Sequence, residues 1–166
     1  TMPRPIFQSE TAHRYCLGLY NLQARVLEAF PGVMLENCAS GGGRFDLVML
    51  YFSQQCWCSD NTDSIVRIRV QHGTSYCYPF RTMGAHVSAC PNHITGNSTR
   101  ARTRGFTSMC GTFGFELDIS QLSADEIALF RTQVQLFKRF SRIIHFGDLY
   151  RLWDPFEVPL CSWMFV

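Results

Sequence analysis

The chain has 166 residues, of which 46% are apolar and 17% charged, the ordinary balance of a globular domain with its own core. This composition excludes disordered, collagenous and low-complexity chains. The net charge of +2, from 15 basic and 13 acidic residues, gives no indication of a nucleic-acid partner. No apolar run reaches the roughly 18–20 residues of a membrane helix, so no membrane partner is expected. The first ten residues are polar, include two prolines and do not resemble a signal peptide.

Eight cysteines occur along the chain, a density below that of disulfide-stabilised scaffolds. Most lie in apolar runs, which predicts free, buried thiols that act as small hydrophobic side chains. Free thiols favour a reducing compartment such as the cytoplasm, with secretion as the alternative. Cys56 and Cys58, together with Cys90 and His93, are a candidate zinc site, but their spacings fit no common structural zinc pattern. We therefore predict no metal and no cofactor.

Helical periodicity and turn signals predict the helices in chain order. They cover residues 9–30, 47–51, 65–70, 99–105 and 123–146. Ser123 and Glu126 form a capping box at the start of the last of these helices. Short apolar runs predict strands over residues 33–38, 54–58, 74–78 and 109–117, and a long irregular stretch over 81–98. Two antiparallel strands, 149–152 and 162–166, end the chain.

Helices that alternate with short apolar strands predict the α/β class with a parallel sheet. Polar loops follow the strands at their carboxyl ends, where both barrels and open sheets place their active sites. Four such strands are half of a (β/α)8 barrel, which typically needs about 250 residues. The chain is therefore either a small open sheet or part of a barrel.

A glycine-rich loop follows the first predicted strand and reads Cys-Ala-Ser-Gly-Gly-Gly-Arg over residues 38–44. Glycine lets the backbone turn freely and approach a ligand closely. The pattern matches neither of the common phosphate-binding loops. By spacing alone, a structural strand-to-helix turn and a ligand-binding loop are equally good interpretations.

A second motif follows the next predicted strand and reads Trp-Cys-Ser-Asp-Asn-Thr-Asp over residues 57–63. The ring of Trp57 is suited to stack on the apolar face of a sugar. Asp60 lies near the strand end, where a catalytic carboxylate would stand. Asp63 is better explained as the cap of the following helix.

Five further motifs occur downstream in a fixed order. They are Thr-Met-Gly-Ala-His-Val-Ser at 82–88, Pro-Asn-His at 91–93, Thr-Arg-Gly at 103–105, Gly-Thr-Phe-Gly-Phe-Glu-Leu-Asp at 111–118, and Phe-Gly-Asp-Leu-Tyr-Arg-Leu at 146–152. With the two motifs above, they resemble the α-galactosidases of glycoside hydrolase family 36. The likeness runs from about His13 to the C-terminus, whereas residues 1–5 show no strong match.

The resemblance implies a retaining exo-glycosidase that releases terminal α-galactose from melibiose and raffinose without a cofactor. It implies a (β/α)8 TIM barrel between two β-rich domains. Residues 1–144 would be the second half of the barrel, and residues 145–166 would begin a C-terminal antiparallel β-sandwich domain. The implied partner is an α-galactoside, and the parent enzyme is expected to be a homo-oligomer.

The resemblance also assigns roles to residues. Asp60 matches the general acid/base, while Cys38, Ala39, Ser40 and Gly41 match a loop that contacts galactose near its 2-hydroxyl; Trp57 is the remaining candidate for substrate binding. The nucleophile of the family lies in a Lys-Trp-Asp motif, which this chain lacks, its only lysine being Lys138. We therefore expect the nucleophile upstream and the isolated chain to be inactive. Cys58, beside the acid/base motif, departs from the residue types expected there.

The chemistry fits these roles, because a retaining glycosidase uses two carboxyl groups about 5–5.5 Å apart, one as nucleophile and one as acid/base. Three alternatives remain open. The chain is a galactose-binding remnant without catalysis, or a relative that transfers galactose to sucrose, as raffinose synthases do, or a zinc-binding module.

Overall fold

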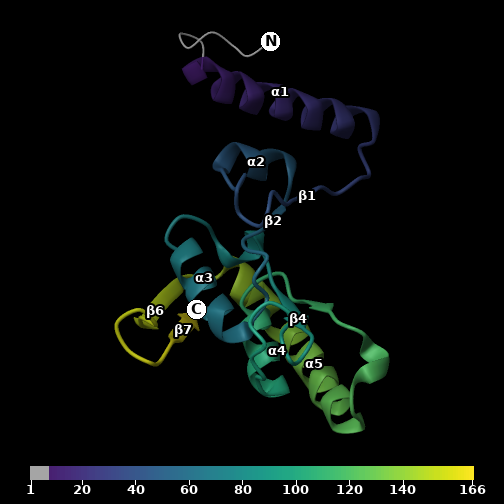
Figure 1. Cartoon of the computed structure of the whole chain (residues 1–166), viewed down its shortest axis with the longest axis vertical. Helices are drawn as coiled ribbons and strands as arrows, with labels where there is room; N and C mark the ends of the chain where they lie inside the picture. Colours follow the sequence, from purple (N-terminus) through teal and green to yellow (C-terminus); the bar gives the residue numbers. More distant parts are fainter. Residues whose placement is uncertain (1–7) are drawn as a thin grey trace.

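The alternation of helices and strands is present in the computed structural model, which describes residues 8–166 (Figure 1). Residues 1–7, which belong to the first ten residues that do not resemble a signal peptide, lie outside this range. The helices are α1 (Gln8–Ala29), α2 (Leu47–Phe52), α3 (Ser64–Thr74), α4 (Ala101–Met109) and α5 (Ala124–Phe146). The strands are β1 (Glu36–Asn37), β2 (Gln55–Trp57), β3 (Met83–Gly84), β4 (His86–Ser88), β5 (Gly114–Glu116), β6 (Leu149–Trp153) and β7 (Ser162–Phe165). None of the helices within 8–166 is both long and apolar enough to cross a membrane.

The described residues form two small parallel sheets and one antiparallel pair. In the first sheet β1, β2 and β3 run parallel, with Cys56 opposite Met83. In the second, β4 and β5 run parallel, with His86 opposite Gly114. Strands β6 and β7 pair antiparallel at the end of the chain. The predicted mixed α/β class, the parallel pairing and the C-terminal antiparallel strands are therefore confirmed.

The strand predicted over residues 74–78 is wrong. Helix α3 continues through Thr74, and the chain then turns, with the Cys77 amide donating to the Thr74 carbonyl at 3.1 Å. The aromatic and β-branched side chains that suggested a strand instead pack on another part of the molecule. The Arg151 guanidinium lies 4.3 Å from the centre of the Tyr76 ring. Tertiary contacts thus override the local preference for a strand.

The third strand of the first sheet comes instead from the stretch that was predicted to be irregular. Residues 81–98 contain β3 and β4, two and three residues long, which are too short to show an alternating pattern. Their hydrogen-bond partners come from β2 and β5. The strand predicted over 109–117 shrinks to β5, because α4 extends to Met109 and a turn covers residues 110–112.

Local capping sets the helix boundaries. Asp46 caps α2 by accepting from the Met49 amide at 2.7 Å. The capping box of Ser123 and Glu126 is present at the start of α5, as predicted, with both reciprocal hydrogen bonds formed. These contacts satisfy amides that a helix start leaves without a partner.

The apolar core lies where the two parallel sheets meet α4 and α5. Its buried side chains are Met49, Cys56, Trp57, Phe80, Met83, Ala85, Val87, Met109 and Phe130. Cys56 is the one buried thiol in the described residues, and Cys38, Cys77 and Cys90 are exposed. The prediction that most thiols are buried is therefore wrong, although all eight are free. The pKa values of Cys56 and Cys110 are raised to about 12, mainly by burial. These two thiols are therefore poor nucleophiles.

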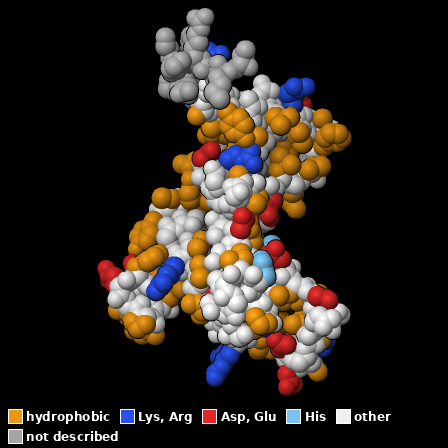
Figure 2. All heavy atoms as spheres, viewed as in Figure 1, with side chains coloured by type: hydrophobic (Ala, Val, Ile, Leu, Met, Phe, Trp, Pro, Cys, Tyr) orange, Lys and Arg blue, Asp and Glu red, His pale blue; other side chains and the backbone are white. Residues whose placement is uncertain are grey.

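Helix α1 stands at one end of the molecule, next to α2 (Figure 1). Polar contacts connect it to β1 and to the start of α2: Tyr20 donates to the Asp46 carboxylate at 3.0 Å, and Gln23 donates to Asn37 at 2.8 Å. Apolar side chains are prominent on this part of the surface (Figure 2). Tyr15, Leu22 and Phe30 are each more than half exposed.

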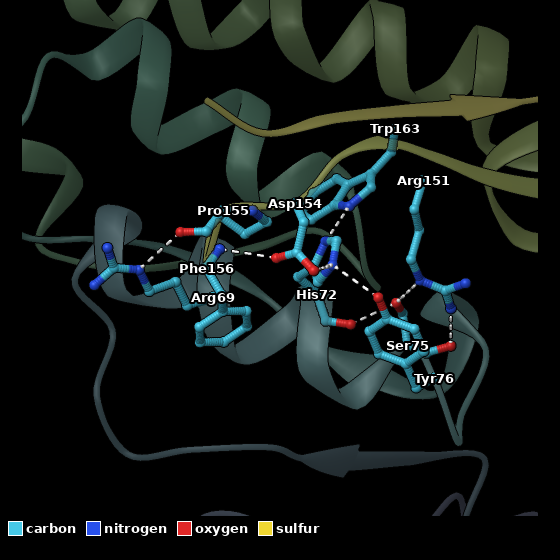
Figure 3. A network of polar contacts seen from close by, with 9 residues as sticks. All are labelled: Arg69, His72, Ser75, Tyr76, Arg151, Asp154, Pro155, Phe156 and Trp163. Atoms are coloured by element: carbon cyan, nitrogen blue, oxygen red, sulfur yellow. Dashed lines mark hydrogen bonds and ion pairs between the residues drawn. The ribbon is translucent and has the colours of Figure 1, made fainter. Parts of the chain in front are cut away.

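The C-terminal strand pair is held against the end of α3 by a polar cluster around His72 (Figure 3). The indole N–H of Trp163 donates to Nδ1 of the fully buried His72 at 3.0 Å. Asp154 Oδ2 lies 3.5 Å from Nε2 of the same ring. Arg151 donates to the Ser75 hydroxyl at 2.9 Å and also to its carbonyl. The strand pair thus docks on α3 through directed hydrogen bonds as well as through aromatic packing.

Candidate active site

The glycine-rich loop and the Asp60 loop touch backbone to backbone. A Cβ placed on Gly41 would lie 2.6 Å from Ser59 Cα and 2.9 Å from the Asp60 nitrogen. Gly41 also has φ = +74°, a conformation that favours glycine. A Cβ on Gly42 would come within 2.8 Å of the Cys58 carbonyl oxygen. The two motifs that lie about 20 residues apart in the sequence therefore form one unit at the carboxyl ends of β1 and β2.

Hydrogen bonds within the glycine-rich loop hold its shape. The Ala39 amide donates to the Gly41 carbonyl at 3.1 Å, and the Gly43 amide donates to the Ala39 carbonyl at 3.2 Å. Cys38 and Ser40 are exposed, Ala39 is half-buried, and Gly41 is buried beneath them. Ser40 has a positive φ of 48°. The loop thus presents Cys38 and Ser40 to solvent while Gly41 contacts the neighbouring loop.

Asp60 is exposed, three residues beyond the end of β2. Side chains fix the backbone that follows it: the Asn61 amide donates to Ser59 Oγ at 3.1 Å, and the Asp63 amide donates to Asn61 Oδ1 at 3.0 Å. Within residues 8–166 the Asp60 carboxylate takes part in no hydrogen bond or ion pair. An exposed carboxylate on a braced loop is available to an external group.

Asp63 has the capping role predicted for it. It is buried, and its Oδ1 accepts from the Ile65 amide at 2.8 Å at the start of α3. Its Oδ2 accepts from the Thr95 hydroxyl at 2.6 Å and from the Asn97 amide group at 2.7 Å. Burial raises the pKa of this carboxyl group, but these hydrogen bonds outweigh burial and lower the pKa overall. Asp63 is therefore occupied in holding the loop and the helix.

The ring of Trp57 lies beneath the Asp60 loop and is 8% exposed. The His86 ring centre is 4.7 Å from the indole centre, and the Arg67 guanidinium is 5.1 Å from it. Gly84 on β3 also packs on the indole, because a Cβ there would lie 2.6 Å from Trp57 Cε3. Protein groups thus cover the ring that was expected to stack on a sugar, and its position is that of a support for the loop.

Arg67 is a residue of this site that the sequence motifs did not single out. It is 3% exposed, and its guanidinium donates to the Ser59 carbonyl at 3.4 Å and to the Gly84 carbonyl. Burial lowers its pKa. The sequence feature that could have indicated Arg67 is the spacing of Asp63, Arg67 and Gln71, which places them on one face of a helix. A polar face of this kind usually faces solvent, but these three side chains are buried.

The zinc-site hypothesis finds no support in the structure. No group of three or more His, Cys, Asp or Glu side chains within residues 8–166 lies close enough together to hold a metal ion. The Cys90 thiol contacts the Thr99 carbonyl at 3.6 Å instead. The candidate site consists of the glycine-rich loop and the Asp60 loop, with the buried side chains of Trp57, Asp63 and Arg67 next to them.

A family model described as Melibiase matches residues 3–147. The chain belongs to the melibiase family. The match begins ten residues before His13, where the resemblance seen in the sequence begins. It confirms the family that these motifs indicated.

The melibiase relatives are α-galactosidases much longer than this chain. AgaA of Geobacillus stearothermophilus is 49% identical over 162 residues, which cover 98% of this chain and 22% of that protein. The bifunctional α-galactosidase/sucrose kinase AgaSK of Mediterraneibacter gnavus is 47% identical over 161 residues, 97% of this chain and 17% of the relative. The chain thus spans about a fifth of the length of these relatives.

Solved structures of α-galactosidases of glycoside hydrolase family 36 have the same fold as this chain. The structure of AgaA in complex with raffinose superposes on it with a TM-score of 0.93 at 47% identity, and the match covers 100% of this chain and 23% of the AgaA chain. AgaA in complex with stachyose gives a TM-score of 0.92 at 48% identity, over 100% of this chain and 23% of its own length.

Proposed function

We propose that this chain supplies the acid/base half of a retaining α-galactosidase site, and that a longer polypeptide completes both the site and a (β/α)8 barrel. The observation that carries this is the packing of Gly41 against Ser59 and Asp60. It joins two family motifs at the carboxyl ends of parallel strands, where barrel enzymes bind their substrates. The two structures of AgaA, one in complex with raffinose and one with stachyose, support an α-galactoside as the substrate class.

In this proposal the Asp60 carboxyl group protonates the glycosidic oxygen while a second carboxylate attacks the anomeric carbon. The bond to the leaving group breaks, and a covalent galactosyl-enzyme forms. Asp60, now a carboxylate, removes a proton from water, which attacks the same carbon; the bond from that carbon to the second carboxylate breaks, and galactose is released. These two steps need no cofactor. The second carboxylate is outside this chain, because the chain contains no Lys-Trp-Asp motif.

The glycine-rich loop is the proposed binding surface for galactose. Cys38 and Ser40 are exposed on the loop that packs against Ser59 and Asp60, while Ala39 and Gly41 shape its backbone. A loop without bulky side chains lets a sugar hydroxyl come close to the backbone. Residues 145–166 are proposed to begin a separate β-domain, since the chain changes from α5 to antiparallel strands there. Homo-oligomerisation of the complete enzyme stays a prediction.

Activity is best tested in a chimera in which these 166 residues replace the matching segment of the Geobacillus stearothermophilus enzyme. We expect the chimera to hydrolyse raffinose, and Asp60→Asn to lower kcat on raffinose by about 10²–10⁴-fold. The loss should be much smaller for the first turnover of 4-nitrophenyl α-galactoside, because nitrophenolate leaves without protonation. Azide should speed later turnovers, since it attacks the galactosyl-enzyme without needing a base.

Full activity of the Asp60→Asn chimera on raffinose would refute the acid/base role. Galactose binding without turnover, measured by calorimetry on a folded chimera, would favour the binding-remnant alternative. Transfer of galactose to added sucrose in preference to water would favour the galactosyl-transfer alternative.

A further inference from the structure

Arg67 is a buried charge directly beneath the Asp60 loop. Its guanidinium contacts two carbonyl groups that leave neighbouring strands: that of Ser59, after β2, and that of Gly84, at the end of β3. It also lies over the Trp57 ring and is oriented by Gln71, whose Oε1 accepts from Nε at 3.3 Å. Within residues 8–166 no carboxylate lies within 4.0 Å of it.

A buried guanidinium without an adjacent carboxylate is costly, and an aliphatic side chain would fill the same space more favourably. What only arginine offers here is a planar set of donors that reaches two carbonyls at once while stacking on an aromatic ring. One of those carbonyls belongs to Ser59, the residue immediately before Asp60. Gly41 packs on the backbone of the same residue, since a Cβ there would lie 2.6 Å from Ser59 Cα. The backbone of Ser59 is therefore contacted by both Gly41 and Arg67.

We propose that Arg67 is a positioning residue for the general acid/base: it holds the Ser59 carbonyl and the Trp57 ring, and so directs the Asp60 carboxyl group toward the glycosidic oxygen. This inference rests on the acid/base role proposed above for Asp60. Loss of Arg67 would let the 58–60 backbone shift without removing any group that touches substrate. A displacement of about 1 Å in a catalytic group is enough to cost roughly 10²-fold in rate.

The inference predicts a dependence on the leaving group that a general loss of stability would not produce. A misdirected acid slows the departure of a sugar, which needs a proton, but hardly affects nitrophenolate, which does not. In the chimera, Arg67→Gln should lower kcat on raffinose by about 10²-fold, with KM little changed. The rate of the first turnover of 4-nitrophenyl α-galactoside should fall far less. Arg67→Lys, which keeps the charge and one donor direction, should recover part of the raffinose rate.

Arg69→Gln is the matched control, because Arg69 is exposed on the same helix and its one hydrogen bond within residues 8–166 is to the Pro155 carbonyl, at 3.4 Å. It should leave both substrates unaffected. Equal losses on both substrates for Arg67→Gln, or no loss at all, would overturn the inference. If Arg67→Gln does not fold, the ratio of the two rates in Arg67→Lys decides, and an unchanged ratio overturns it. Failure of the acid/base proposal itself is recognised separately, from an Asp60→Asn chimera that remains fully active.

Discussion

At the scale of single residues, the site depends on the absence of a side chain at Gly41. Its positive φ and its contact with Ser59 and Asp60 are two independent reasons for glycine at this position. Either reason alone would make a substitution costly, and together they couple the shape of the glycine-rich loop to the placement of Asp60.

We expect Gly41→Ala to lower the free energy of unfolding by about 1–2 kcal/mol from backbone strain, and by more if the two loops separate. Gly73→Ala in α3 is the control, since a Cβ there meets no atom within 4 Å. It should leave stability unchanged or raise it by about 0.5–1 kcal/mol. Urea denaturation of the folded chimera measures the change in the free energy of unfolding for each of the two substitutions. Equal effects of the two substitutions would contradict the importance of the Gly41 contact.

At the scale of elements, α3 connects the candidate site to the C-terminal strand pair. Its first turn carries the Asp63 cap beneath the Asp60 loop, and its last turn carries His72, which receives the Trp163 N–H. Because Nδ1 of His72 accepts this hydrogen bond, the neutral ring carries its proton on Nε2, toward Asp154 and Tyr76. One helix thus has a polar connection at each end.

Trp163→Phe tests the second connection, because it removes the donor and leaves a buried acceptor unpaired. We expect the free energy of unfolding to fall by about 1–3 kcal/mol, with faster hydrogen exchange in β6 and β7. Trp153→Phe on the partner strand is the matched control, since Trp153 is 55% exposed. Similar exchange rates in the two variants would show that the Trp163 hydrogen bond does not hold the strand pair.

At the scale of the whole molecule, the chain exposes too much surface for its mass. The accessible surface is 10869 Å², whereas a compact monomer of 19.0 kDa exposes about 8,400 Å². Large apolar side chains contribute to the excess: Met34 is 85% exposed, Tyr51 82% and Leu47 70%. Surfaces of this kind are normally covered by another part of a protein.

We therefore expect the isolated 166-residue chain to self-associate in sedimentation experiments and to show no hydrolysis of raffinose. The chimera, in which the rest of the relative covers the α1 and α2 surface, should behave as a discrete species with activity. A monodisperse chain that hydrolyses raffinose unaided would contradict both the surface argument and the proposal that the nucleophile lies outside it.

Local chemistry determined part of this structure. The capping box at Ser123, the Asp63 cap, the position of α5 and the C-terminal strands were predictable, because each depends on residues a few positions apart. The family was predictable as well, because the order of several short motifs is a property of the chain itself.

The tertiary structure decided the rest, because the deciding contacts join residues far apart in the chain. The turn at 75–78 depends on Arg151, which is 76 residues beyond Ser75. The burial of Arg67 and the covering of Trp57 depend on β3 and β4, whose strands are too short to be recognised alone. The same holds for Gly41: the sequence permits a tight turn there, but only the fold brings Ser59 and Asp60 against it and makes glycine necessary.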